Sequence, residues 1–301
     1  MTITSFLKRM VIPALAILPV ALSCEGPPKE AEGRITFVIG GLGASPRNVT
    51  VRSATVEGSM DGVAFLDELS VEASVKEFSG GTATIEALFP PSHSKTYTLF
   101  YGDVPIVSEH DVDLQEGGNH IISRPALSGN DPVGTRGMYK GREAVRVDLD
   151  SRKYVVATMN EGARSEEDFG EGYWTFENAL ARFSSGTQGC DAVGVWRLPT
   201  LEEVNSFVNF PNSSTYRIAV PGRQFSDKDG YDPTSLFFPF AGYVSGGMLG
   251  YGGTRGYFWS SQGEGTVEAH YLTFNVGYCN VYITGRNYAL SVRLFCALPG
   301  E

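Results

Sequence analysis

The sequence predicts a two-domain chain, with an all-β sandwich in residues 33–127 and an α+β domain in residues 135–301. Three observations lead to this fold class. The first half alternates apolar and polar residues over short runs, which is the period of a β-strand. The second half has two stretches with helical spacing, followed by strands and long Gly-rich loops. Between the halves, residues 128–134 have the Ser, Gly, Asn and Pro composition typical of a linker.

The first segment, residues 1–23, is typical of a signal peptide. Two basic residues precede an apolar run that ends at Leu22 and is too short to span a bilayer well. The run closes with Ala21-Leu22-Ser23-Cys24, which resembles the lipobox of bacterial lipoproteins. This resemblance implies cleavage before Cys24 and lipidation of its thiol. A plain secretory signal with a chance cysteine is the alternative.

Residues 24–32 are polar and contain two prolines, so we predict a short tether between the lipid and the folded chain. No second apolar span follows, and membrane attachment would therefore be through the lipid on Cys24 alone. These features predict a cell-envelope location, as an outer-membrane lipoprotein exposed at the surface.

The sandwich prediction for residues 33–127 depends on short strand-like runs separated by turn residues about every ten positions. The arrangement is Ig-like, and its place after a lipobox and tether resembles the pilin-like domains of Bacteroidetes surface proteins. The predicted strands cover residues 34–39, 48–56, 82–88, 96–100 and 119–122.

Two helices are predicted in the second half. The first covers residues 174–183, where four apolar residues recur at helical spacing. The second begins at Thr200, which can cap the helix together with Glu203 three residues later, as in a capping box.

Four segments of the second half together resemble one family. They are Tyr154–Gly170, Trp196-Arg197-Leu198-Pro199-Thr200, Gly256–Ser261 and Ser291-Val292-Arg293-Leu294. In this order they resemble the Fibrobacter-succinogenes-type paralogous domain, a relative of formylglycine-generating enzymes. The resemblance implies a C-type-lectin-like fold for residues 135–301. We interpret Trp259 as a buried indole, and Arg293 as a buried or half-buried guanidinium that needs carboxylate or carbonyl partners.

Composition and motifs argue against several function classes. The net charge of −10 provides no basic surface for nucleic acid. No HExxH, CxxC or GxSxG motif is present, and the histidines are scattered, so the sequence predicts no enzyme, no metal and no cofactor. The acidic stretch 227–232 lacks the glutamate that closes a calcium loop, which favours a simple turn. A divergent formylglycine-type oxidase or hydrolase using Cys296 is a weaker alternative.

Three cysteines remain after Cys24, so they cannot all pair within one chain. An oxidising envelope allows one disulfide, for which Cys190 with Cys296 is our prediction. Cys279 would then stay unpaired.

The C-terminal segment 275–288 is dense in tyrosine and asparagine, which supply large contact area and adaptable hydrogen bonds, as in antibody paratopes. It resembles the variable region of proteins diversified by retroelements, and an ordinary hairpin is the alternative. We expect the ligand-binding face to be centred on this segment, with Tyr243 and Tyr251 nearby. The predicted ligand-binding residues are Asn275, Tyr278, Asn280, Tyr282, Asn287, Tyr288 and Tyr257.

These features predict a surface-anchored adhesion or ligand-binding protein whose partner is a protein or glycan on another cell. The alternative is a minor pilus or outer-membrane assembly subunit, in which the N-terminal sandwich acts by strand exchange.

Overall fold

The computed structural model describes residues 32–59, 62–166, 168–170, 172–183, 194–217, 220–226 and 235–299. Residues 31–301 form one compact unit. The signal peptide, the lipidation site at Cys24, Cys190 and the acidic stretch 227–232 lie outside the described residues. Within the described part of the chain, no helix is long and apolar enough to cross a bilayer.

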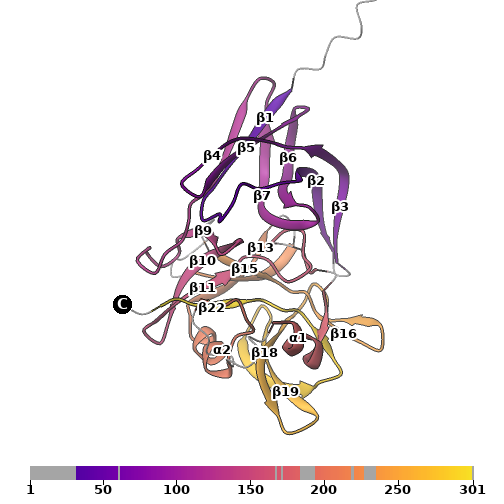
Figure 1. Ribbon diagram of the computed structural model, residues 1–301. Helices are drawn as coiled ribbons and strands as arrows, with labels where there is room; N and C mark the ends of the chain where they lie inside the picture. The colour runs from indigo at the N-terminus through magenta and orange to yellow at the C-terminus, as the bar shows by residue number, and fades with distance from the viewer. Residues whose placement is uncertain are drawn as a thin grey trace, which may run out of the picture. The chain divides into compact units, whose positions relative to one another are not determined.

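The first half contains two four-stranded sheets (Figure 1). One has the order β4-β5-β1-β8, with β1 antiparallel to β5 and parallel to β8. Its strands are β1 (Gly33–Ile39), β4 (Ser74–Ser79), β5 (Thr82–Phe89) and β8 (Asn119–Arg124). The other has the order β3-β2-β6-β7 and is antiparallel throughout. Its strands are β2 (Val49–Ser59), β3 (Gly62–Glu72), β6 (Ser92–Tyr101) and β7 (Val104–Leu114).

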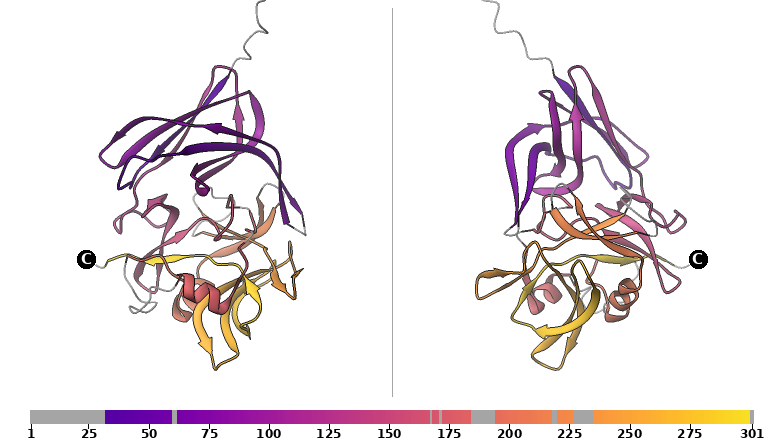
Figure 2. Two further views of the ribbon diagram at one scale, coloured as in Figure 1. Left: turned by 45° about the vertical axis from the view of Figure 1, so that its right-hand side comes forward. Right: turned by 180° about the vertical axis from the view of Figure 1, so that it is seen from behind.

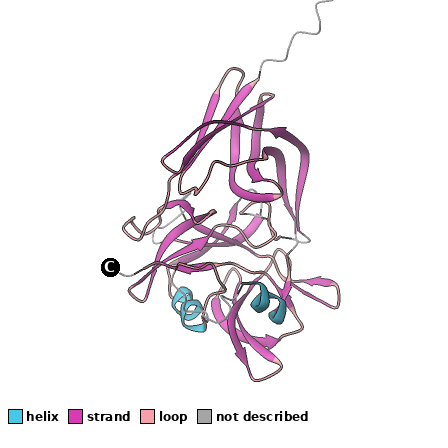
Figure 3. Cartoon of the chain, in the orientation of Figure 1, coloured by secondary structure: helices cyan, strands magenta, loops and turns pink. Residues whose placement is uncertain are grey.

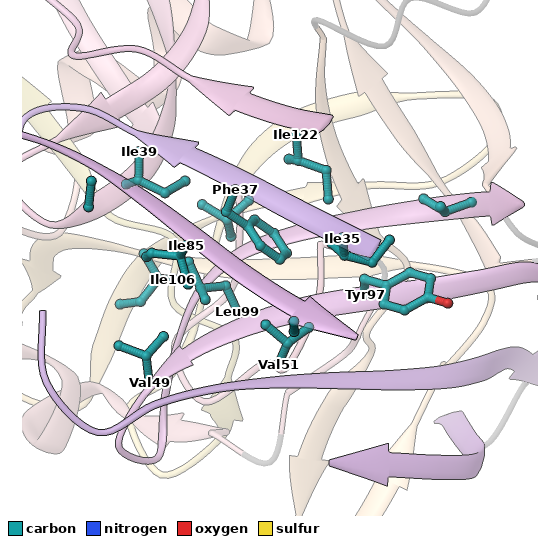
Figure 4. Packing of buried hydrophobic residues seen from close by; sticks show 14 of the residues in the cluster. Ile35, Phe37, Ile39, Val49, Val51, Ile85, Tyr97, Leu99, Ile106 and Ile122 are labelled. Carbon is teal, nitrogen blue, oxygen red and sulfur yellow. The ribbon is translucent and has the colours of Figure 1, made fainter. Parts of the chain in front are cut away.

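The two sheets share one hydrophobic core, as Figure 4 shows. In β1, Ile35, Phe37 and Ile39 are completely buried at alternate positions, and in β6 Leu99 faces them. Each buried side chain of this size stabilises the fold by about 1.5–3 kcal/mol. Four of the five predicted strand runs fall within strands of the structure, and the run 48–56 begins one residue before β2, because their alternation reflects this one-sided burial.

The second half is built from four small sheets. The order β22-β11-β10-β9 joins β9 (Arg136–Tyr139), β10 (Arg142–Leu149), β11 (Arg152–Ala157) and β22 (Phe295–Ala297). The order β12-β21-β16-β17 joins β12 (Trp174–Thr175), β16 (Tyr243–Ser245), β17 (Met248–Gly250) and β21 (Ala289–Leu290). The third sheet contains β13 (Asn212–Arg217), β14 (Val220–Phe225) and β15 (Leu236–Pro239). The fourth contains β18 (Gly256–Glu264), β19 (Glu268–Phe274) and β20 (Cys279–Gly285).

The predicted C-type-lectin-like, α+β fold of residues 135–301 is wrong. Strand makes up 58% of the described residues and helix 7%, in a nearly all-β arrangement of small sheets (Figure 3). The physical reason is that the helical pattern covers only two turns in each of two places, whereas the long Gly-rich and aromatic stretches pair as short strands. We therefore describe the second half as a β domain with two short helices.

Within the described residues the helices are α1 (Phe176–Phe183) and α2 (Leu201–Val208). The predicted capping box of α2 is confirmed, because the Thr200 hydroxyl accepts from the Glu203 backbone and the Glu203 carboxylate accepts from the Thr200 backbone. Each helix buries one apolar face against the small sheets, with Phe176 and Phe207 almost completely buried. These packed helices hold the β18-β19-β20 sheet in place.

Candidate functional site

Strand register places tyrosines on one face of the β18-β19-β20 sheet. Tyr271 of β19 lies opposite Tyr282 of the edge strand β20, and opposite Trp259 of β18. Residues directly opposite in an antiparallel pair point to the same side, so their side chains contact each other. On the other side of β20, Cys279 and Val281 pack into the core that contains α2. The alternation along β20 therefore directs Tyr282 away from the core.

Tyrosines from other elements join this face. The ring centroid of Tyr243 lies 5.2 Å from those of Tyr257 and Tyr288, and 5.9 Å from that of Tyr251. Tyr257 stacks on Tyr271 at 5.6 Å. Tyr278 lies in the turn just before β20, close enough to act electrostatically on both members of this stacked pair. We call this set the tyrosine face; it comprises Tyr243, Tyr251, Tyr257, Tyr271, Tyr278, Tyr282 and Tyr288.

The tyrosine face is open at its rim and buried at its centre. Tyr251 is 51% exposed and Tyr282 50% exposed, whereas Tyr257 is 7% exposed. Burial raises the pKa of Tyr271 to about 12, and neighbouring tyrosines add to the effect. Burial also raises the pKa of Tyr257, although a hydrogen bond with Arg255 opposes the rise. Both hydroxyls therefore stay protonated at neutral pH, and each offers a donor and an acceptor.

An arginine holds the turn that leads into β20. Nη1 of Arg223 donates to the carbonyl oxygens of Asn275 and Tyr278, at 2.6 and 3.3 Å. Nε of the same arginine donates to the Asn212 side chain. A guanidinium offers five donors in a fixed geometry, so one side chain can fix two carbonyls at once. This contact sets the position of the backbone that carries Tyr278.

A second arginine holds the other end of β20. Nε of Arg286 donates to the Glu268 carbonyl oxygen at 2.9 Å, and Nη1 donates to the Glu177 carboxylate of α1 at 3.3 Å. Its guanidinium also lies 4.9 Å from the centroid of the Phe176 ring, a cation–π contact. Both ends of the segment 275–288 are thus fixed by arginine, and a fixed segment loses little conformational entropy on binding.

Buried polar residues give the tyrosine face a rigid base. The Trp259 indole N–H donates to the Trp174 carbonyl oxygen at 2.6 Å. Arg293 is 1% exposed, and it donates to the Asn160 side chain at 2.9 Å and to the Phe237 carbonyl oxygen at 3.2 Å. The predictions that Trp259 is buried and that Arg293 is buried with carbonyl partners are confirmed. These residues belong to the framework and do not reach the surface.

The structure brings some of the predicted ligand-binding residues together and separates others. Four of the tyrosines, at positions 257, 278, 282 and 288, lie on the tyrosine face. Asn280 is exposed and shares the side of β20 that carries Tyr282. The Asn275 side chain instead accepts from the backbone of Gly277 and Tyr278, at 2.8 and 3.0 Å, and so caps its own turn. Asn287 is exposed in the turn that follows β20.

Sequence reasoning missed two residues of this face. Tyr271 is not among the predicted ligand-binding residues, because its role depends on the register with Tyr282. Arg255 lies in a Gly-rich loop and gave no local signal. A signal was present in the distribution of charge: residues 235–299 contain only Glu264 and Glu268 out of 34 acidic residues in the chain.

Cys279 and Cys296 both carry free thiols, so the predicted pairing of Cys296 with Cys190 is wrong. Burial raises the pKa of each of the two thiols to about 11, and nearby cations lower it only in part. At neutral pH both are therefore present as thiols and not as nucleophilic thiolates. Cys279 faces the α2 side of its strand, away from the tyrosine face.

A polar pocket of about 210 Å³ lies between the turn after β10 and the start of α2. It is smaller than common small-molecule sites, which occupy about 300–1,000 Å³. Its Ser206 hydroxyl is already bonded to Asp150. No group of three or more metal-binding side chains comes together within the described residues. The tyrosine face is therefore the stronger candidate site.

The chain matches no family model, and no curated protein or solved structure is similar to it. The geometry of the tyrosine face is thus the basis for the functional argument.

Proposed function

We propose that this chain is a surface-anchored binding protein that recognises a macromolecule on another cell through the tyrosine face. The observation that carries the proposal is the convergence of seven tyrosines, half of the 14 in the chain, on one side of a small clamped sheet. They come from β16, β18, β19, β20 and the turns beside them, so only the folded chain assembles them.

The physical properties of this face suit recognition more than catalysis. Tyrosine offers a large contact area at small entropic cost, and buried tyrosines are frequent among the residues that dominate binding energy. The rim rings at Tyr251 and Tyr282 leave about half of their surface for a partner. The arginine contacts at both ends of β20 fix the backbone before binding, which limits the entropy lost in a complex.

The anchor is the part of this proposal that rests on the sequence alone. A lipid on Cys24 would attach the protein to the membrane, and the tether that follows would let the folded unit extend from it. A flat aromatic face at the end of such an anchor suits contact with another surface. We propose the outer membrane as the location.

The test compares binding of the full-length chain and of variants to intact cells and to a glycan array. The double variant Tyr251→Ala, Tyr282→Ala should bind at least about tenfold more weakly, because tyrosines of this kind contribute about 2 kcal/mol or more at interfaces. Phe78→Ala is the matched control, since Phe78 is an aromatic residue of β4 that is 37% exposed. Equal binding by the double variant and the wild type would show that the tyrosine face is not the binding site.

A further inference from the structure

Arg255 occupies a fixed position among the tyrosines. Its backbone N–H donates to the Tyr251 carbonyl oxygen at 3.1 Å, and its own carbonyl accepts from the Gly242 N–H at 2.8 Å. Its guanidinium lies 4.5 Å from the centroid of the Tyr251 ring and forms a hydrogen bond with Tyr257. The backbone bonds and the ring contact hold this side chain at the rim of the face, where it is partly exposed.

Arg255 differs in its partners from the arginines that form ion pairs. The groups that act on it electrostatically are Tyr257, Tyr278 and Tyr251, and among the described residues no carboxylate pairs with it. A guanidinium has five N–H donors, and one tyrosine oxygen uses few of them. The arginines that do pair with carboxylates include Arg124, Arg136, Arg142, Arg197 and Arg286.

The stretch of chain that contains Arg255, residues 235–299, carries few negative charges. The only two carboxylates of residues 235–299, Glu264 and Glu268, lie at the end of the β18–β19 hairpin. That end is roughly 20 Å along the strand from Tyr257, at about 3.3 Å per residue. The whole chain carries a net charge of −10, yet within the described residues no ion pair joins Arg255 to a carboxylate. An acidic partner would be repelled elsewhere and attracted here, which favours one orientation of binding.

The rim next to Arg255 also exposes apolar side chains. The β16–β17 hairpin projects from the second half, as Figures 1 and 2 show, and Met248 at its end is 74% exposed. Leu249 beside it is 38% exposed. Tyrosine, methionine and arginine are the residues enriched in protein–protein interfaces. The combination of exposed tyrosine, methionine and arginine therefore favours a protein partner.

We propose that Arg255 anchors a carboxylate of the partner, so that the tyrosine face docks an Asp- or Glu-bearing segment of another protein. This inference rests on the proposed function and specifies its ligand. The carboxylate accepts two N–H donors from the guanidinium, while the tyrosine rings and Met248 cover the apolar neighbours of the acidic residue.

The experiment screens the full-length chain against a displayed library of random peptides, and peptides that also bind the Tyr251→Ala, Tyr282→Ala variant are discarded. The remaining peptides should be enriched in Asp and Glu. Changing the acidic residue to its amide should weaken binding to the wild type about tenfold or more, and should not change binding to Arg255→Gln. Replacing the acidic residue of the peptide with lysine should restore binding to the Arg255→Glu variant, because the charges of the pair are then exchanged. Arg47→Gln, at an exposed arginine of the first half, is the control, and urea unfolding verifies that each variant is folded.

The outcomes separate the two proposals. If the peptides that need Tyr251 and Tyr282 are not enriched in Asp and Glu, or if they bind Arg255→Gln as tightly as the wild type, the role of Arg255 is overturned. The proposed function is then still supported. Tyrosine-dependent binding to a glycan array without any such peptide overturns the protein partner in favour of a glycan. If neither library yields a tyrosine-dependent ligand, both proposals fail.

Discussion

Removal of the Glu143 charge should destabilise the fold strongly at neutral pH. The Glu143 side chain is completely buried and forms ion pairs with Arg124 and with Arg136, the latter at 2.9 Å. Arg136 in turn pairs with Glu166 at 2.7 Å. Glu109 pairs with Arg124 at 2.5 Å, so the chain of charges runs from β7 and β8 of the first half into the second half.

The magnitude follows from the pKa of this carboxyl group. Burial alone raises the pKa of Glu143, but Arg136 and Arg124 outweigh it and lower the pKa from 4.5 to about 2. Because the pKa is lowered in the folded state, the ionised group stabilises the fold by about 3 kcal/mol at neutral pH. This contribution is complete above pH 4.5 and is lost as the pH falls toward 2.

Urea unfolding at several pH values tests this argument. Glu143→Gln should lower the free energy of unfolding by about 3 kcal/mol at pH 7, and the difference from the wild type should shrink to roughly half at pH 3. The control is Glu86→Gln, since Glu86 pairs at 3.6 Å with Arg34, which is half exposed; such a pair contributes less than about 1 kcal/mol. A loss below about 1 kcal/mol for Glu143→Gln, or a loss that is independent of pH, would refute the reasoning.

Three further predictions concern the cap, the face and the anchor. Glu203→Ala should cost about 3–5 kcal/mol in urea unfolding, because it leaves Arg197 buried without this carboxylate and removes the Glu203 half of the α2 capping box; a loss under about 1 kcal/mol would contradict the structure. Tyr251→Asn should change the melting temperature little, because asparagine tolerates the left-handed backbone at this position (φ 57°). The same variant should bind the ligand more weakly, because it lacks the aromatic ring. Unchanged ligand binding would show that the Tyr251 ring does not contact the ligand. Cys24→Ser should move the protein from the membrane to the soluble fraction and abolish labelling by radioactive palmitate, and an unchanged membrane fraction would disprove the lipid anchor.

Features that depend on neighbouring residues could be predicted from the sequence. The capping box at Thr200 and Glu203 is local, and so is the alternation that marks β1 and β5. The buried guanidinium of Arg293 was predictable from its apolar neighbours. In each case the physical cause acts within a few residues of the pattern that reveals it.

The fold class of the second half could not be predicted from the same patterns. Several of its strands have only two to four residues, such as β12 and β21, and they pair with partners more than a hundred positions away. The run Leu236–Pro239 is buried at every position and therefore shows no alternation. Short apolar runs of this kind do not distinguish strand from helix. The true signal lies in long-range pairing, which a single sequence does not display.

The same argument explains why the tyrosine face was only partly anticipated. The density of tyrosine and asparagine in 275–288 pointed to the correct edge strand, but Tyr271 and Arg255 join the face through register and loop geometry. Asn275, which composition alone made a ligand-binding candidate, caps its own turn. Composition identifies the segment, and strand alternation then decides which of its residues point outward.

The separation of framework from face has a consequence for how this protein can change. The exposed residues Asn280 and Tyr282 lie on an edge strand whose backbone is held by the ladder with β19. Arg223 and Arg286 fix the ends of that strand through carbonyl oxygens, which every residue type provides. Substitutions at the exposed positions therefore leave the clamps and the ladder intact and cost little stability. A surface with this property can acquire new partners without loss of the fold, which is the physical requirement for diversification of the kind found in the variable regions that segment 275–288 resembles.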